Sequence, residues 1–159
     1  MKKIILILTL ALFVAATGCA QDTETTVSQN EIQHNYRMDE VDAYMASVKE
    51  QSDSIKYELH NAVLNQNQMN MKSMELYELW DELLNYLWEE LKNTLPEDEF
   101  ANLLDEQLIW IADKENEAKE AAKGFEGGSL YPFIVNGRSA ALTEERVYEL
   151  YEILNDSAV

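Results

Sequence analysis

Cysteine, proline and glycine are all scarce in this chain. Among 159 residues there are one cysteine, two prolines and five glycines. Since Cys19 is the only cysteine, no disulfide can form within the chain, and the fold depends on an ordinary apolar core. Hydrophobic residues make up 47% of the sequence and include three tryptophans, so such a core is feasible.

Basic residues are also few. The chain has 12 Lys and Arg against 30 Asp and Glu, which gives a formal net charge of −18. This balance excludes nucleic acid as a partner, because phosphates are bound by Lys and Arg. It also disfavours adsorption to anionic lipid surfaces. The negative charge of the chain would attract a cationic protein. The alternative is that the acidic residues serve only to keep the protein soluble.

Only two histidines are present, and neither marks a catalytic or metal site. Bundle di-iron sites need two Glu-x-x-His motifs. Glu31 to His34 is one such string, but His60, which follows Leu59, does not form a second. No calcium loop of EF-hand form appears, and no histidine is placed recognisably beside a serine. Any pair of glutamates suited to glycoside chemistry is uninformative among so many acidic residues. We therefore predict a non-enzymatic chain with no metal or cofactor.

Residues 1–18 have the form of a leader. A basic head, Lys2-Lys3, precedes an apolar run from Ile4 to Thr17, which is shorter than the ~20 residues of a spanning helix. A cysteine directly after small residues resembles the lipobox of bacterial lipoprotein signals. The resemblance implies cleavage before Cys19 and a diacylglyceryl anchor on its sulfur. The protein would then be exported and held to a membrane outside the cytoplasm. A plain secretory signal and a transmembrane anchor are the alternatives.

The segment after the leader is predicted to be a flexible tether over residues 19–34, since it is polar and has no periodicity.

A long amphipathic helix is predicted over 35–66, with a polar middle at Gln51 and Ser52 and a turn at Asn65 to Gln68. Its apolar residues recur at three- and four-residue steps: Val41, Tyr44, Val48, Ile55, Leu59 and Val63.

Two further helices follow in the pattern. The first is predicted from about Met69 to Asn93. The second is predicted to follow Thr94 as its cap, with Glu97 completing a capping box and Pro96 in the first turn. The inner face predicted for this third helix consists of Phe100, Leu103, Leu104, Leu108, Ile111, Ala118 and Ala122.

Residues 124–142 hold four of the five glycines, and we predict a long loop there, with a short extended piece at residues 133–135. Thr143 is then expected to cap a final helix. The aromatic residues Phe125, Tyr131 and Phe133 are candidate contacts for a partner, unless they cover one end of the core. The fold class is thus all-α: about four helices with a glycine- and aromatic-rich loop before the last, on a lipidated tether.

Short motifs occur in a fixed order through the second half of the chain. They are Trp80-Asp81, Leu84-Asn85 and Trp88, then Gln107, Trp110-Ile111 and Lys114-Glu115, then Gly127-Gly128-Ser129, and finally Thr143-x-x-Arg146. Their order and spacing resemble the domain of the LprI-type lysozyme inhibitors, which we place at residues 67–156. Trp88 stands where the family usually has tyrosine, and Lys114-Glu115 replaces Arg-Asp, which loses the guanidinium fork. Many relatives also carry disulfide cysteines, which this domain lacks.

The motif residues are interpreted first as structural. A tryptophan on a helix usually buries its ring and finds a partner for its N–H, and Asp81 is expected to pair with Lys114 or Arg146. The resemblance implies lysozyme as the partner, and many lysozymes are strongly cationic. The predicted function is an envelope lipoprotein that binds a protein and inhibits lysozyme by occluding its cleft. The alternative is a structural or assembly lipoprotein that binds another envelope protein.

Overall fold

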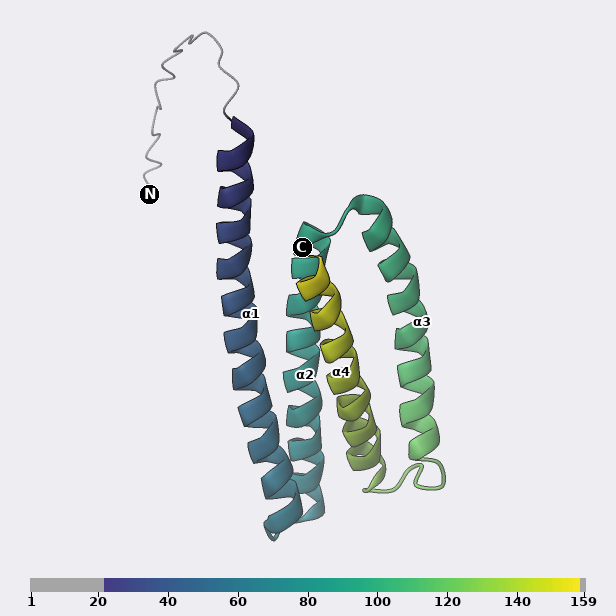
Figure 1. Cartoon of the computed structure of the whole chain (residues 1–159). Helices are drawn as coiled ribbons and strands as arrows, with labels where there is room; N and C mark the ends of the chain where they lie inside the picture. Colours follow the sequence, from purple (N-terminus) through teal and green to yellow (C-terminus); the bar gives the residue numbers. More distant parts are fainter. Residues whose placement is uncertain (1–21, 158–159) are drawn as a thin grey trace, which may run out of the picture.

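Four α-helices make up the part of the chain that the structure describes. This computed structural model describes the backbone of residues 22–157 and the side chains of residues 37–157. The helices lie side by side in the spatial order α1, α2, α4, α3 (Figure 1). The predicted all-α fold is confirmed, with these bounds: α1 (Asp22–Asn61), α2 (Gln66–Thr94), α3 (Glu97–Ala121) and α4 (Tyr131–Asp156).

The core lies mainly between α2 and α4, and α1 packs along α2. Fully buried side chains come from all three helices at helical spacing: Val41 and Val48, Trp80, Leu83, Leu87 and Leu91, and Val147, Leu150 and Leu154. Burying one such side chain stabilises a fold by ~1.5–3 kcal/mol. This core can therefore stabilise the bundle without a disulfide.

Helix α1 begins well before the start that the sequence predicted. Residues 22–34 are helical in backbone, where composition predicted a flexible tether. No glycine or proline occurs between residues 20 and 61, so α1 contains neither of the residues that most disfavour a helix interior. Cys19, the leader and the first tether residues lie outside the described residues. No helix in the described part is long and apolar enough to cross a membrane.

The turn between α1 and α2 lies earlier than predicted. Asn65 to Gln68 is not the turn but the start of α2, because Asn65 and Gln68 form a capping box. Asn65 Oδ1 accepts from the Gln68 N–H at 3.0 Å, and Gln68 Oε1 accepts from the Asn65 N–H at 2.9 Å. The reciprocal pair satisfies two backbone donors that a helix start leaves open. Val63, predicted on the inner face, is fully exposed.

The start of α3 differs in its cap. Thr94 does not cap this helix, since its hydroxyl donates to the Glu90 carbonyl oxygen and accepts from Arg37. Pro96 occupies the N-cap position, and no side chain caps the helix there. Three acidic residues in the first turn, Glu97 to Glu99, still favour the positive end of the helix dipole.

The predicted loop over residues 124–142 is wrong beyond its first third. Helix α4 begins at Tyr131, so residues 133–135 are helical rather than extended, and Thr143 is a buried mid-helix residue rather than a cap. Pro132 lies in the first turn, where its missing N–H is tolerated. Packing of α4 against α2 outweighs the turn preference of Asn136-Gly137.

Candidate functional site

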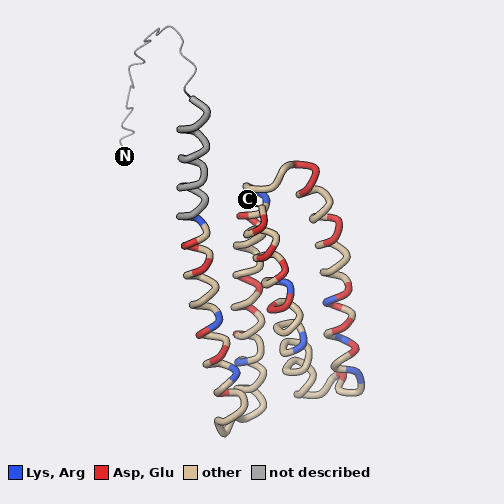
Figure 2. The backbone as a smooth tube through the Cα atoms, viewed as in Figure 1, with Lys and Arg blue, Asp and Glu red and all other residues tan. Residues whose placement is uncertain are grey.

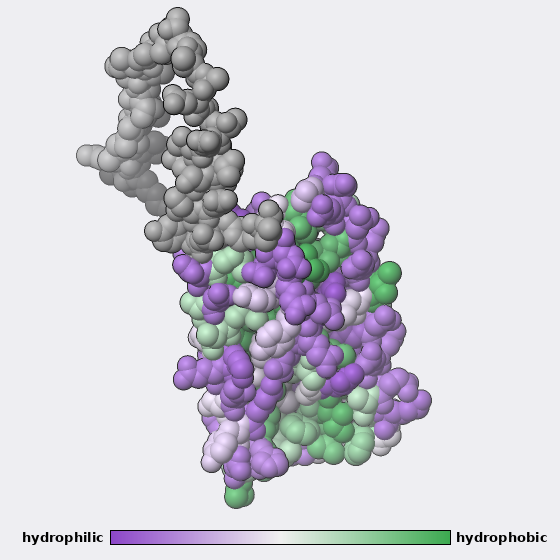
Figure 3. All heavy atoms as spheres, viewed as in Figure 1, coloured by the Kyte–Doolittle hydropathy of each residue, from purple (hydrophilic) through white to green (hydrophobic). Residues whose placement is uncertain are grey.

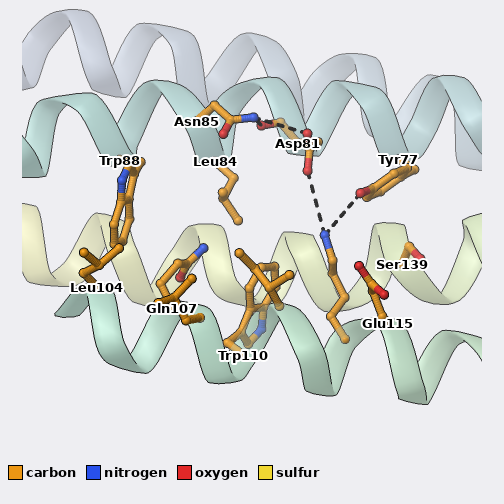
Figure 4. A pocket seen from close by; sticks show the side chains of 13 residues that line it. Tyr77, Asp81, Leu84, Asn85, Trp88, Leu104, Gln107, Trp110, Glu115 and Ser139 are labelled. Carbon is orange, nitrogen blue, oxygen red and sulfur yellow. Dashed lines mark hydrogen bonds and ion pairs between the residues drawn. The ribbon is translucent and has the colours of Figure 1, made fainter. Parts of the chain in front are cut away.

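A groove lies between α2 and α3. Helices α2 and α3 both pack on α4 and diverge from each other, so side chains of α2 and α3 form the walls and Ser139 of α4 lies between them (Figure 4). The cavity volume is ≈ 380 Å³, within the ~300–1,000 Å³ of ligand and docking sites. Its lining is Tyr77, Asp81, Leu84, Asn85, Trp88, Leu104, Gln107, Leu108, Trp110, Ile111, Lys114, Glu115 and Ser139.

The α3 wall is an apolar stripe that the sequence placed in the core. Leu104, Leu108 and Ile111 are 41%, 58% and 39% exposed, and all three line the groove. Successive helix residues are ~100° apart, so this stripe lies one step around from the residues that α3 buries. Those buried residues are Leu103, Gln107, Lys114 and Ala118. The prediction that Leu104, Leu108 and Ile111 face the core is therefore wrong, because the helix uses the neighbouring face.

Lys114 forms the polar end of the groove. Its ammonium donates to the Tyr77 hydroxyl at 3.1 Å and lies 3.9 Å from Asp81 Oδ1 (Figure 4). It also lies 4.9 Å from the ring centre of Trp110, close enough for a cation–π contact. Although the side chain is only 10% exposed, its charge is balanced by a carboxylate and two aromatic rings. Lys114 therefore fixes the spacing of α2 and α3.

Arg146 of α4 supports the groove from behind. Its Nε donates to Gln107 Oε1 at 2.9 Å, and its NH1 donates to Glu149 at 2.7 Å. The guanidinium lies 5.9 Å from the ring centre of Trp110. Gln107, Trp110 and Arg146 thus connect the α3 wall to α4 through one set of polar and π contacts, which makes the groove a preformed feature rather than a gap.

Charge around the groove is strongly acidic. The α3 sequence holds nine acidic residues against two lysines, and acidic positions predominate along this helix in Figure 2. Asp81 and Glu115 lie at the groove itself. Hydrophobic side chains nevertheless reach the surface, as the green areas between hydrophilic ones show on the face viewed in Figure 3. The outer side of α3 is therefore both acidic and apolar.

A family model described as lysozyme inhibitor LprI matches residues 60–150. The chain belongs to the LprI family. The match covers more than half of the chain and contains every residue that lines the groove, whereas almost all of α1 lies before it. Searches of the curated proteins and of the solved structures each found no match.

The LprI motif residues divide between the groove and the core. Asp81, Leu84, Asn85, Gln107, Trp110 and Lys114 line the groove, with Arg146 behind them. Trp80 is fully buried on the other side of α2, where its indole N–H donates to Ser52 Oγ at 3.1 Å. This hydrogen bond accounts for the polar middle of α1. Thr143 is fully buried in α4.

Gly127 and Gly128 lie in the α3–α4 loop and do not line the groove. The φ of Gly127 is +76°, which L side chains rarely adopt. A Cβ on Gly128 would lie 3.1 Å from the Phe125 carbonyl oxygen. Both glycines therefore shape the loop.

The three aromatic candidate contacts do not form one docking loop. Phe125 is 45% exposed in the α3–α4 loop, whereas Tyr131 and Phe133 are half-buried in the first turn of α4. Sequence reasoning missed the groove because it assigned Leu103, Leu104, Leu108 and Ile111 to a single inner face. Together with Ile109, these residues spread over more of the helix than one neighbour can cover, and that surplus was the available signal.

Within the described residues no group of three or more His, Cys, Asp or Glu side chains is arranged to hold a metal ion. The groove offers one buried ammonium, two carboxylates, two amides, one serine hydroxyl, three aromatic rings and an apolar wall. Such a lining can bind and position a partner through apolar contacts and hydrogen bonds.

Proposed function

We propose that this LprI-family chain is a non-enzymatic cell-envelope protein that binds a lysozyme-type enzyme and inhibits it. The observation that carries the proposal is the family match over residues 60–150, whose description is that of a lysozyme inhibitor. The groove supports binding rather than catalysis, since its residues offer apolar surface and hydrogen bonds without a nucleophile and base in contact.

Charge supports a cationic target. The chain carries 30 acidic residues against 12 basic ones, and a protein field of this sign steers a cationic enzyme toward it. Inhibition then follows from occlusion of the substrate cleft of the enzyme. No chemical step is required of the inhibitor.

Export and lipidation at Cys19 are part of the same proposal. The apolar run from Ile4 to Thr17 and the small residues before Cys19 support a lipoprotein leader. Such a leader would place the domain outside the cytoplasmic membrane, where wall-degrading enzymes act. The chain expressed with its own leader should incorporate labelled palmitate and sediment with membranes, and Cys19→Ser should abolish the label. A wild-type chain without label would contradict the anchor.

The function is tested by adding the purified full chain to a cationic lysozyme that digests bacterial cell walls. We expect the initial rate to fall with inhibitor concentration at low salt and to recover with salt, because exposed charges are screened beyond ~10 Å at 0.1 M. Neither inhibition nor binding at low ionic strength would overturn the proposal. Retrieval of a native envelope partner by cross-linking, with lysozyme unaffected, would favour the assembly alternative.

A further inference from the structure

We propose that the α2–α3 groove is the surface on which the basic partner docks, with an apolar side chain of that partner inserted between Trp88, Leu104 and Leu108. The inference rests on the proposed function and assigns to it a site. It also specifies the partner segment: an apolar residue flanked by Lys or Arg.

The first support is an apolar wall that the described chain leaves partly exposed. Leu104, Leu108 and Ile111 follow one another at steps of four and three residues, so they form a continuous ridge along α3. Their exposed fractions, between 39% and 58%, are high for three large apolar side chains on one ridge. Contiguous exposed apolar surface edged by charge is typical of interaction sites. Trp88 and Leu84 face this ridge from α2 (Figure 4).

The second support is that the groove is fixed before anything binds. Lys114 joins α3 to Tyr77 and Asp81 of α2, and Gln107 joins α3 to Arg146 of α4. These contacts lie beneath and beside the apolar ridge. A preformed site loses less conformational freedom on binding than a flexible one.

Charge decides between the occupants. A second copy of this chain would bring two α3 helices together, each with nine acidic residues against two lysines, and like charges at an interface oppose association. A basic partner would instead be attracted by the acidic residues of α3. The carboxylates of Asp81 and Glu115 line the groove and can attract Lys or Arg of such a partner.

The groove also has a direction. Asp81, Lys114 and Glu115 occupy one end, which is therefore charged and polar, whereas the end formed by Leu84, Trp88 and Leu104 carries no charge of its own. The apolar side chain of the partner therefore belongs at the uncharged end. A carbonyl oxygen of the partner fits the Lys114 end, because the ammonium has three donors and makes one hydrogen bond at 3.1 Å.

The test compares Leu108→Asp with Ile109→Asp in the full chain. Both residues are exposed on α3, at 58% and 64%, but only Leu108 lines the groove. The two variants gain the same charge on the same helix, so they form a matched pair. Circular dichroism and thermal unfolding establish that both remain folded, and Leu108→Met is the conservative rescue.

We expect Leu108→Asp to weaken the affinity for a cationic lysozyme by at least about tenfold, as for a central anchor residue. Ile109→Asp and Leu108→Met should stay within about threefold of wild type. Wild-type binding with equal losses in Leu108→Asp and Ile109→Asp would overturn the groove while leaving the proposed function intact. A wild-type chain that neither binds nor inhibits would overturn both. A wild-type dimer that Leu108→Asp dissociates would instead identify a second copy as the occupant.

Discussion

At the scale of single residues, buried polar groups explain what the hydrophobic pattern missed. Gln107 and Lys114 lie on the packed face of α3, whereas the sequence pattern favoured Leu104, Leu108 and Ile111 there. Each is satisfied by a partner that is distant in sequence, Arg146 and Tyr77 respectively. A pattern of apolar residues along one helix contains no information about such partners. The sequence therefore predicted Leu103, Ala118 and Ala122 correctly as buried but wrongly added Leu104, Leu108 and Ile111.

Gln107→Leu should destabilise the fold by about 1–3 kcal/mol, because the buried Arg146 Nε then has no acceptor. Gln51→Leu is the control, since Gln51 is exposed and contacts only its own helix. Urea unfolding of the two variants measures the difference. Equal stability of the two would show that the Gln107–Arg146 contact contributes nothing.

Ser52 is the corresponding residue in α1. Its hydroxyl accepts from the indole N–H of Trp80, and both side chains are fully buried. Ser52→Ala leaves that N–H without a partner, so we expect a loss of about 1–3 kcal/mol in the free energy of unfolding. Ser54→Ala on the exposed side of α1 should change it by no more than about 0.5 kcal/mol. A similar effect of both substitutions would contradict the role of the hydrogen bond.

At the scale of elements, the existence and order of the helices could be predicted, but the end of the α3–α4 loop could not. Four glycines and Asn136-Gly137 favoured a loop up to residue 142. In the structure only Gly124 and Gly127 have positive φ, and Gly137 is helical. Packing of α4 on α2 determines where α4 begins. The turn preferences of single residues contain no information about this packing.

Two glycine substitutions test where the α3–α4 loop ends and α4 begins, because they should change the stability of the fold in opposite directions. Gly137→Ala should stabilise the fold by about 0.5–1 kcal/mol, because alanine suits a helix interior better and a Cβ meets nothing within 4 Å. Gly127→Ala should destabilise it by about 1–2 kcal/mol, because its φ of +76° is strained for alanine. Thermal unfolding gives both values. A destabilising Gly137→Ala would indicate that residue 137 belongs to a turn.

Helix α1 lies almost entirely outside the family match and is joined to the rest by contacts that titrate. The Tyr151 hydroxyl donates to Asp42 Oδ1 at 2.6 Å, and this hydrogen bond, together with burial, raises the pKa of Tyr151. Burial likewise raises the pKa of Tyr44 and of Tyr86. Lys72 has its pKa raised by hydrogen bonds to Glu75 and to Glu58 of α1.

Because the protonated forms are favoured in the folded state, stability should be fully present below about pH 10 and fall as pH rises through the raised pKa values. Tyr151→Phe should lower stability at pH 8 by about 0.5–1.5 kcal/mol through the lost hydrogen bond. It should also make the alkaline decline shallower. Urea unfolding at several pH values between 8 and 11 measures both. A decline of the same slope in the variant would exclude Tyr151 as a contributor.

At the scale of the whole molecule, composition predicted the sign of the surface charge but not the place where a partner would contact the surface. The net charge of −18 is a property of the chain, whereas the groove exists only because α2 and α3 diverge over α4. Binding to a cationic lysozyme should therefore weaken with salt, through electrostatics, and with Leu108→Asp, through loss of apolar contact. Both effects are measured by titration at two ionic strengths.

The initial rate of cell-wall digestion by a cationic lysozyme at low salt, in the presence of the full chain, tests the central claim most directly. Wild type and Ile109→Asp should both lower this rate as their concentration rises, and Leu108→Asp should require at least about tenfold more protein for the same effect. A digestion rate that wild type leaves unchanged at every concentration would contradict the account.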